Sequence, residues 1–96
     1  MAAAGAEAME RVAAIVREQI LHRTHDEIPH AVEVQVDEIG EREDGLITVL
    51  AHAWAETESQ KGILVGKGGR MVRDVGAGAR KEMEALLGRK VFLDLR

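Results

Sequence analysis

The chain has 96 residues, of which 46% are hydrophobic and 31% are charged, and it contains no cysteine. This length and composition indicate one globular domain and exclude a disordered chain, a disulfide framework and thiolate metal sites. No apolar stretch reaches the roughly 20 residues that cross a bilayer, and the N-terminus lacks the basic segment of a signal peptide, so we expect a cytoplasmic protein.

The net charge of −4 conceals two halves of opposite sign. Residues 1–58 contain 13 acidic and 4 basic residues, a net charge of −9, whereas residues 59–96 contain 9 basic and 4 acidic residues, a net charge of +5. This asymmetry predicts that a surface of the second half binds an anion.

The first half predicts a helix followed by a β-hairpin. Apolar residues recur at a spacing of three and four over residues 7–23, which is typical of an amphipathic helix, and Pro29 prevents that helix from continuing. Alternating residues predict a strand over 31–39 and a return strand over 46–56, joined by a turn at Asp44-Gly45. We expect the face of the return strand that carries Val49 and Ala51 to lie against helices.

The second half predicts two helices and a closing strand. Thr57 and Gln60 form a capping-box pattern for a short helix through Leu64, and Gly88 suits the end of a longer helix over 70–87. A last strand is expected over 90–95. The order α-β-β-α-α-β predicts an α+β fold in which three helices pack on one side of a three-stranded sheet. The buried side of the longer helix is expected to carry Val72, Val75, Ala79, Met83 and Leu86. Gly78 inside that helix has no explanation in the sequence, since glycine is about 1 kcal/mol less favourable than alanine there.

The stretch GILVGKGGRMV, residues 62–72, raises three possibilities for a glycine-rich loop. A nucleotide-hydrolysing P-loop needs four residues between its first glycine and the Gly-Lys pair, followed by Ser or Thr. Only three residues separate Gly62 from Gly66, and Gly68 follows the lysine. The dinucleotide fingerprint also fails, because Met71 occupies its third glycine position. A G-x-x-G turn, Gly66 to Gly69, therefore remains.

Taken alone, a G-x-x-G turn between helices is most often a plain tight turn, but its neighbours here suit a nucleic-acid backbone. Glycines let a sugar-phosphate chain approach closely, and the following helix presents free N–H groups to the turn. Lys67 and Arg70 add positive charge, and nearby aliphatic residues offer a surface for bases. KH domains grip about four nucleotides of a single strand with this combination.

The segment VGKGGRMV, residues 65–72, resembles the KH signature, and the preceding α-β-β order is similar to the type II form of the domain. The blocks EIPHAVEV, SQKGILVGKGGRMV and ARKEMEALLGRKVFLDL, with the acidic turn EREDG, resemble the C-terminal domain of the Era family of GTPases over residues 13–95. The expected organisation is a tail over residues 1–8, disordered or foreign to the natural chain, and one type II KH domain over 9–96.

The resemblance implies binding of single-stranded RNA near the 3′ end of small-subunit ribosomal RNA, during assembly of the small ribosomal subunit. It also implies a preceding GTPase domain in the parent protein, which these residues do not contain. That parent would be cytoplasmic, with the inner face of the membrane as a second, peripheral location. The expected RNA-binding residues are Lys61, Ile63, Val65, Gly66, Lys67, Gly68, Gly69, Arg70, Val72, Arg73, Arg80 and Lys81.

Several alternatives remain open. Arg73, Arg80 and Lys81 also fit the solvated face of a helix. The acidic half and the strand face with Trp54 suit a protein-interaction or regulatory domain, and another type II KH protein of the ribosome or transcription machinery would show the same turn.

Catalysis is not expected from this sequence. His22, His25 and His30 lack the spacing of metal ligands, and the only serine, Ser59, has no base placed beside it. Alternating strand positions and a charged turn explain the carboxylates between Glu33 and Asp44. We therefore expect no enzyme activity, no metal, no cofactor and no small-molecule substrate.

Overall fold

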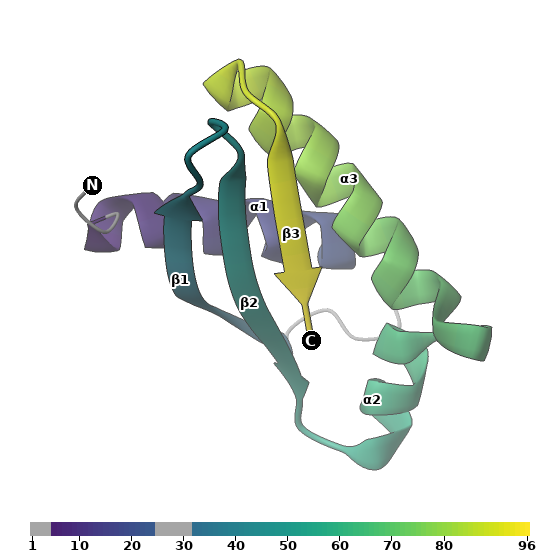
Figure 1. The fold of residues 1–96 in the computed structure, drawn as a ribbon. Coiled ribbons are helices and arrows are strands. Elements are labelled where there is room, and N and C mark those ends of the chain that lie inside the picture. Colours follow the sequence, from purple (N-terminus) through teal and green to yellow (C-terminus); the bar gives the residue numbers. More distant parts are fainter. Residues whose placement is uncertain (1–4, 25–31) are drawn as a thin grey trace.

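The computed structural model describes residues 5–24 and 32–96 and confirms the predicted α+β fold (Figure 1). Its elements are α1 (Ala6–Thr24), β1 (Val32–Glu41), β2 (Ile47–Ala55), α2 (Glu58–Val65), the short 3-10 turn η1 (Lys67–Gly69), α3 (Arg70–Leu87) and β3 (Val91–Leu95).

Some of the sequence predictions fall outside the described residues. They are the start of the first strand at Ala31, the helix-ending Pro29, and His25 and His30. Residues 1–4 of the predicted tail also lie outside, whereas Ala6–Ala8 form the first turn of α1.

The three strands form one sheet in the order β1-β2-β3. β1 and β2 are antiparallel and joined by the predicted hairpin, in which Gly45 has a φ of 88° and its N–H donates to the Arg42 carbonyl at 2.9 Å. β3 is parallel to β2, so the chain crosses from one to the other through α2 and α3. The register of β1 shifts between Val36 and Glu38, which places a bulge at Asp37.

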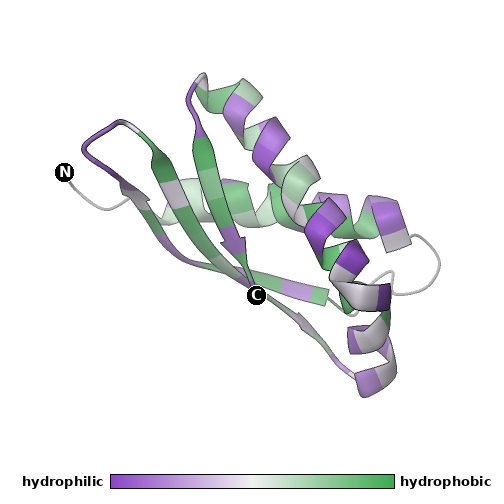
Figure 2. Cartoon of the chain, turned by 45° about the vertical axis from the view of Figure 1, so that its right-hand side comes forward, coloured by the Kyte–Doolittle hydropathy of each residue, from purple (hydrophilic) through white to green (hydrophobic). Residues whose placement is uncertain are grey.

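The core lies between one face of the sheet and helices α1 and α3. Val16 and Ile20 of α1 and Val75 of α3 are completely buried. The small-residue face of β2 packs against the helices as predicted, with Val49 and Ala51 buried. Figure 2 shows mostly apolar residues along β2 and β3 and hydrophilic residues along the exposed side of α3. Within residues 5–24 and 32–96, no helix has both the length and the apolar character that crossing a bilayer requires.

Gly78 lies where α1 and α3 pack against each other. A Cβ atom on this residue would collide with the side-chain amide of Gln19 and would come within 3.1 Å of the Arg23 guanidinium. The absence of a side chain therefore makes room for Gln19, whose amide nitrogen donates to Glu82 at 3.4 Å. A side chain at this position would therefore displace the flexible end of Gln19, which reduces the advantage of alanine over glycine here.

The prediction of Leu86 as a core residue is wrong, because 66% of this residue is exposed. Helical periodicity places Leu86 on the same side as Met83, but the last turn of α3 extends past the hairpin end of the sheet (Figure 1). Helical periodicity indicates the direction in which a side chain points. It does not indicate whether a neighbouring element is long enough to cover that side chain.

Candidate nucleic-acid interface

The position of the G-x-x-G turn is set by the two ends of α2. At the first end, Thr57 Oγ1 accepts from the Gln60 N–H at 3.1 Å, and Gln60 Oε1 accepts from the Glu56 N–H at 3.2 Å, which confirms the predicted capping box. At the other end, the Gly66 N–H donates to the Gly62 carbonyl at 2.9 Å. The buried Leu64 ties this short helix to the core.

Three glycines of the turn have positive φ angles, namely 77° at Gly66, 62° at Gly68 and 78° at Gly69. A Cβ atom on Gly66 would lie 2.7 Å from the backbone nitrogen of Met71, so the chain packs on itself at this point. A Cβ atom on Gly68 or Gly69 would meet no described atom within 4 Å. The turn is therefore closed against the protein at its first glycine and open to an approaching ligand at the next two.

Positive charge gathers where the turn meets α3. Gly69 caps this helix without a side-chain hydrogen bond, and the first turn contains no acidic residue. The positive end of the helix dipole is therefore left for a ligand. Lys67, Arg70 and Arg73 are exposed beside it, and none of the three forms an ion pair with another described residue. An anion approaching the turn meets these three cations.

Apolar side chains border the turn on both sides. Val65 is 40% exposed at the end of α2, while Ile63 and Val72 are partly buried and Ile63 also packs against the core. Lys61 is exposed one helical turn before Val65 and so lies on the same face of α2. Aliphatic surface therefore lies next to the cations, so that bases can pack on it while phosphates meet the positive charge.

The structure separates Arg80 and Lys81 from the rest of the predicted site. Arg80 is ten residues beyond Arg70, or about 15 Å along the axis of α3 at 1.5 Å per residue. Its guanidinium lies 3.9 Å from Glu84, whose carboxylate also accepts from the Val91 N–H at 2.9 Å. Lys67, Arg70 and Arg73 thus form one cluster, and Arg80 and Lys81 lie further along the helix.

A polar contact that was not expected from the sequence lies on the other face of the sheet. His52 Nδ1 is hydrogen bonded to Asp37 Oδ2, and the His52 ring stacks on Trp54 with centroids 5.9 Å apart. The strand alternation places His52 and Trp54 on one face, but the bulge that brings Asp37 beside His52 has no signal in the sequence. Among residues 5–24 and 32–96, no three metal-ligating side chains come together.

A carboxylate with a lowered pKa lies at the hairpin, away from the turn. Arg89 donates to the carboxylate of Glu41 and, at 2.6 Å, to the Gly45 carbonyl. The hydrogen bond from Arg89 lowers the pKa of Glu41 below its ordinary value. These contacts tie the hairpin to the connection between α3 and β3 and carry no catalytic implication.

Comparisons with known proteins agree with this geometry. The KH domain family profile matches residues 27–96. The GTPase Era of Thermosipho melanesiensis is 50% identical over 84 residues, which cover 88% of this chain and 28% of that protein. The GTPase Era of Mycolicibacterium smegmatis is 51% identical over 87 residues, covering 88% and 29%. The chain thus spans less than a third of the length of these curated relatives.

Two crystal structures of Era share the fold. A variant of Aquifex aeolicus Era bound to GDP and aluminium fluoride superposes with a TM-score of 0.86 at 31% identity, covering 92% of this chain and 30% of that one. Era in complex with MgGDPNP and nucleotides 1506–1542 of 16S ribosomal RNA gives a TM-score of 0.82 at 32% identity, covering 88% and 28%.

Proposed function

The chain belongs to the KH domain family, and on this premise we propose that it binds single-stranded RNA at the G-x-x-G turn. The observation that carries the proposal is the open space at Gly68 and Gly69, directly before the uncapped N-terminus of α3. A phosphate placed there meets the positive end of the α3 dipole together with Lys67 and Arg70, an environment that suits a sugar-phosphate backbone.

We assign the following roles within this site. Gly66 to Gly69 approach the RNA backbone, and Lys67, Arg70 and Arg73 neutralise phosphates. Ile63, Val65 and Val72 line the surface on which bases rest, with Lys61 at its margin. Arg80 and Lys81 complete the set further along α3, where a longer RNA would reach them.

The RNA class is suggested by the relatives. The Era that has been crystallised with nucleotides 1506–1542 of 16S ribosomal RNA is 32% identical to this chain. We therefore propose that the ligand is the region near the 3′ end of small-subunit ribosomal RNA, met on the small subunit in the cytoplasm during ribosome assembly. In the parent protein a GTPase domain would accompany this domain, with peripheral contact at the inner face of the membrane as a second location.

We also propose that the domain itself is not an enzyme. The turn lacks the hydroxyl and spacing of a P-loop, and His52 with Asp37 has no nucleophile arranged beside it among the described residues. Any nucleotide hydrolysis would belong to another domain of the parent protein.

The proposal is tested by replacing Lys67 and Gly68 together by aspartate. Gly68 has the left-handed conformation, which aspartate tolerates better than most residues, and no described atom blocks its side chain. The variant should therefore fold while repelling phosphate. We expect its affinity for a short single-stranded RNA from the 3′ region of 16S ribosomal RNA, measured by fluorescence anisotropy, to fall at least about tenfold, or 1.4 kcal/mol.

A matched control separates local from overall charge. Ala14→Asp with Arg17→Asp introduces the same change of net charge on exposed positions of α1. The control should lose much less affinity than the turn variant. Equal binding by the folded turn variant and the parent, or equal losses in both variants, would contradict the assignment of the site to the turn.

A further inference from the structure

Among the described residues, β1 forms one edge of the sheet, and the pairing of β2 shows which backbone groups of β1 are not bonded to β2. On the side of β2 that faces β3, the N–H groups of Ile47 and Ala53 donate to the Lys90 and Arg96 carbonyls at 3.0 and 2.9 Å. Alternate residues of a strand direct their N–H and C=O groups to opposite sides. The even-numbered residues of β2 therefore bond toward β1.

The register then identifies the free groups of β1. Trp54 pairs with Glu33, and His52 with Gln35, so these two β1 residues use their backbone groups on β2. Val32, Val34 and Val36 consequently direct N–H and C=O groups to the open edge, while their side chains are buried in the core. A strand added at this edge would place the residues opposite these valines on the helical face of the sheet.

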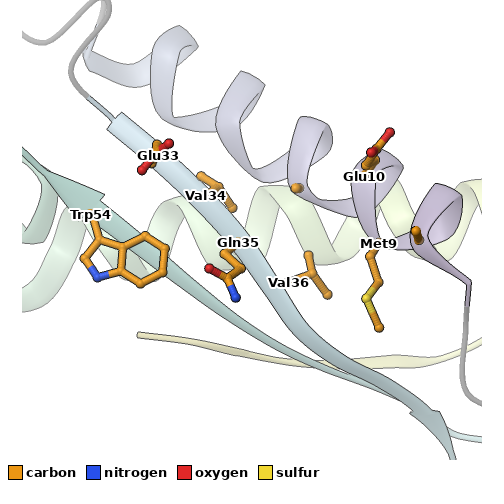
Figure 3. A pocket seen from close by; sticks show the side chains of 9 residues that line it. Met9, Glu10, Glu33, Val34, Gln35, Val36 and Trp54 are labelled. Carbon is orange, nitrogen blue, oxygen red and sulfur yellow. The ribbon is translucent and has the colours of Figure 1, made fainter.

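The first turns of α1 overhang this edge. Figure 1 shows α1 extending past β1 on the side away from β2. Beneath the overhang is a hollow of about 380 Å³, lined by Met9 and Ala13 of α1 and by residues on both faces of β1. In Figure 3, Met9 lies across from Val36, whereas Gln35 and Trp54 lie on the other face of the strand. The hollow therefore wraps around the free edge of β1.

The charge of this edge determines what can occupy it. Glu10 and Glu33 line the hollow and are exposed, and none of the described residues that line it is a lysine or an arginine. Asp37 and Glu38 continue the acidic surface along β1. A second copy of the chain pairing through β1 would bring these carboxylates together, which is unfavourable for directly opposed residues. Acidic side chains and the bulge at Asp37 thus protect the edge from self-association and limit regular pairing to Val32–Val36.

We propose that the free edge of β1 binds an extended segment of a partner protein in which aliphatic and basic residues alternate. The aliphatic residues, opposite Val32, Val34 and Val36, pack under Met9 and Ala13. The basic residues face Glu33 and the exposed ring of Trp54. The segment extends the sheet by one strand, a recognition mode in which backbone hydrogen bonds supply affinity and alternate side chains supply specificity.

The probe is a capped peptide of about eight residues in which lysine and valine alternate, a typical strand length. Binding is followed by the fluorescence of Trp54, the only tryptophan, and by amide hydrogen exchange. We expect saturable binding in which the amides of Val32, Val34 and Val36 become protected, whereas those of Glu33 and Gln35 are protected already. Saturable binding without this alternation, or no binding at millimolar peptide, overturns the proposal.

Two matched controls test backbone pairing and charge separately. The same peptide carrying N-methyl groups on alternate amides keeps its charge but cannot complete the ladder, and it should not bind; equal binding overturns the proposal. Glu33→Lys should weaken binding about fivefold to tenfold, because a cross-strand pair is lost and like charges then face each other. Glu43→Lys makes the same charge change at an exposed hairpin position and should have little effect. Equal effects of the two variants would also overturn it.

Discussion

Glycine serves two different physical needs in the G-x-x-G turn. At Gly66 a side chain would press against the Met71 backbone, so glycine is needed by the protein itself. At Gly68 and Gly69 only the positive φ disfavours other residues, by roughly 1–2 kcal/mol, and the surrounding space is open. Substitutions at Gly68 can therefore report on the ligand, whereas substitutions at Gly66 would report mainly on folding.

The two glycines inside α3 allow a prediction about stability. No described atom lies within 4 Å of a Cβ on Gly76, so Gly76→Ala should raise the free energy of unfolding by about 0.5–1 kcal/mol through helix propensity. Gly78→Ala should give a smaller gain, because Gln19 must move and its hydrogen bond to Glu82 is disturbed. Urea denaturation measures both changes.

Ala77→Gly provides the control for this comparison, since Ala77 is exposed on the same helix. Replacing this alanine by glycine should lower the free energy of unfolding by about 1 kcal/mol. Equal gains for Gly76→Ala and Gly78→Ala would show that the contact with Gln19 has no energetic consequence.

Among the elements, the boundaries of helices and strands followed closely from local chemistry. Thr57 is the N-cap of α2, Gly88 is the C-cap of α3 with a φ of 66°, and Asp44-Gly45 lies in the hairpin turn. Each of these signals depends only on adjacent residues, so the sequence was enough to predict it. The bulge at Asp37 and the exposure of Leu86 could not be predicted, because they depend on how two distant segments align and how far each extends.

In the candidate site, too, the features that depend on neighbouring residues could be predicted and the long-range ones could not. The turn, its charge and its aliphatic borders are local, so the sequence identified them. The separation of Lys67 and Arg70 from Arg80 follows from the straight course of α3, which a list of basic residues does not show. The free edge of β1 had no signal at all, because strand order is a property of the assembled sheet.

The cap of α2 leads to a prediction at the level of the element. With eight residues, α2 is too short to be stable alone, so Thr57→Ala should lower the free energy of unfolding by about 1 kcal/mol. Hydrogen exchange of the α2 amides should accelerate more than that of α1. Thr57→Ser keeps the hydroxyl and should restore most of the loss; a failure of serine to do so would assign the effect to the methyl group instead.

In the whole molecule, the acidic and basic residues that are separated along the sequence also lie on different surfaces. The acidic edge of β1 and the basic side of α3 belong to opposite ends of the strand order, since α3 packs beside β3. The net charge of −4 therefore does not oppose binding of a polyanion at the turn. Repulsion by the acidic edge would also favour one orientation of the domain as it approaches RNA.

This arrangement predicts the salt dependence of RNA binding. If Lys67, Arg70 and Arg73 neutralise about three phosphates, the logarithm of the association constant should fall with the logarithm of salt concentration with a slope of about −2. For a short RNA at the turn, Arg73→Ala should reduce this slope by about 0.7, whereas Arg80→Ala should leave it nearly unchanged. Titrations at several salt concentrations measure the slopes, and equal reductions would show that the RNA follows α3 further than proposed.

The parallel pairing of β2 with β3 has a consequence for the order of events during synthesis. The G-x-x-G turn lies within the connection between these strands, and β3 is made after both helices. Closing such a long connection is a non-local, comparatively slow step. Until Val91–Leu95 has left the ribosome that makes it, α3 lacks one of its supports and the turn should not hold its binding geometry. A nascent chain that still lacks β3 should therefore bind RNA at the turn more weakly than the finished domain.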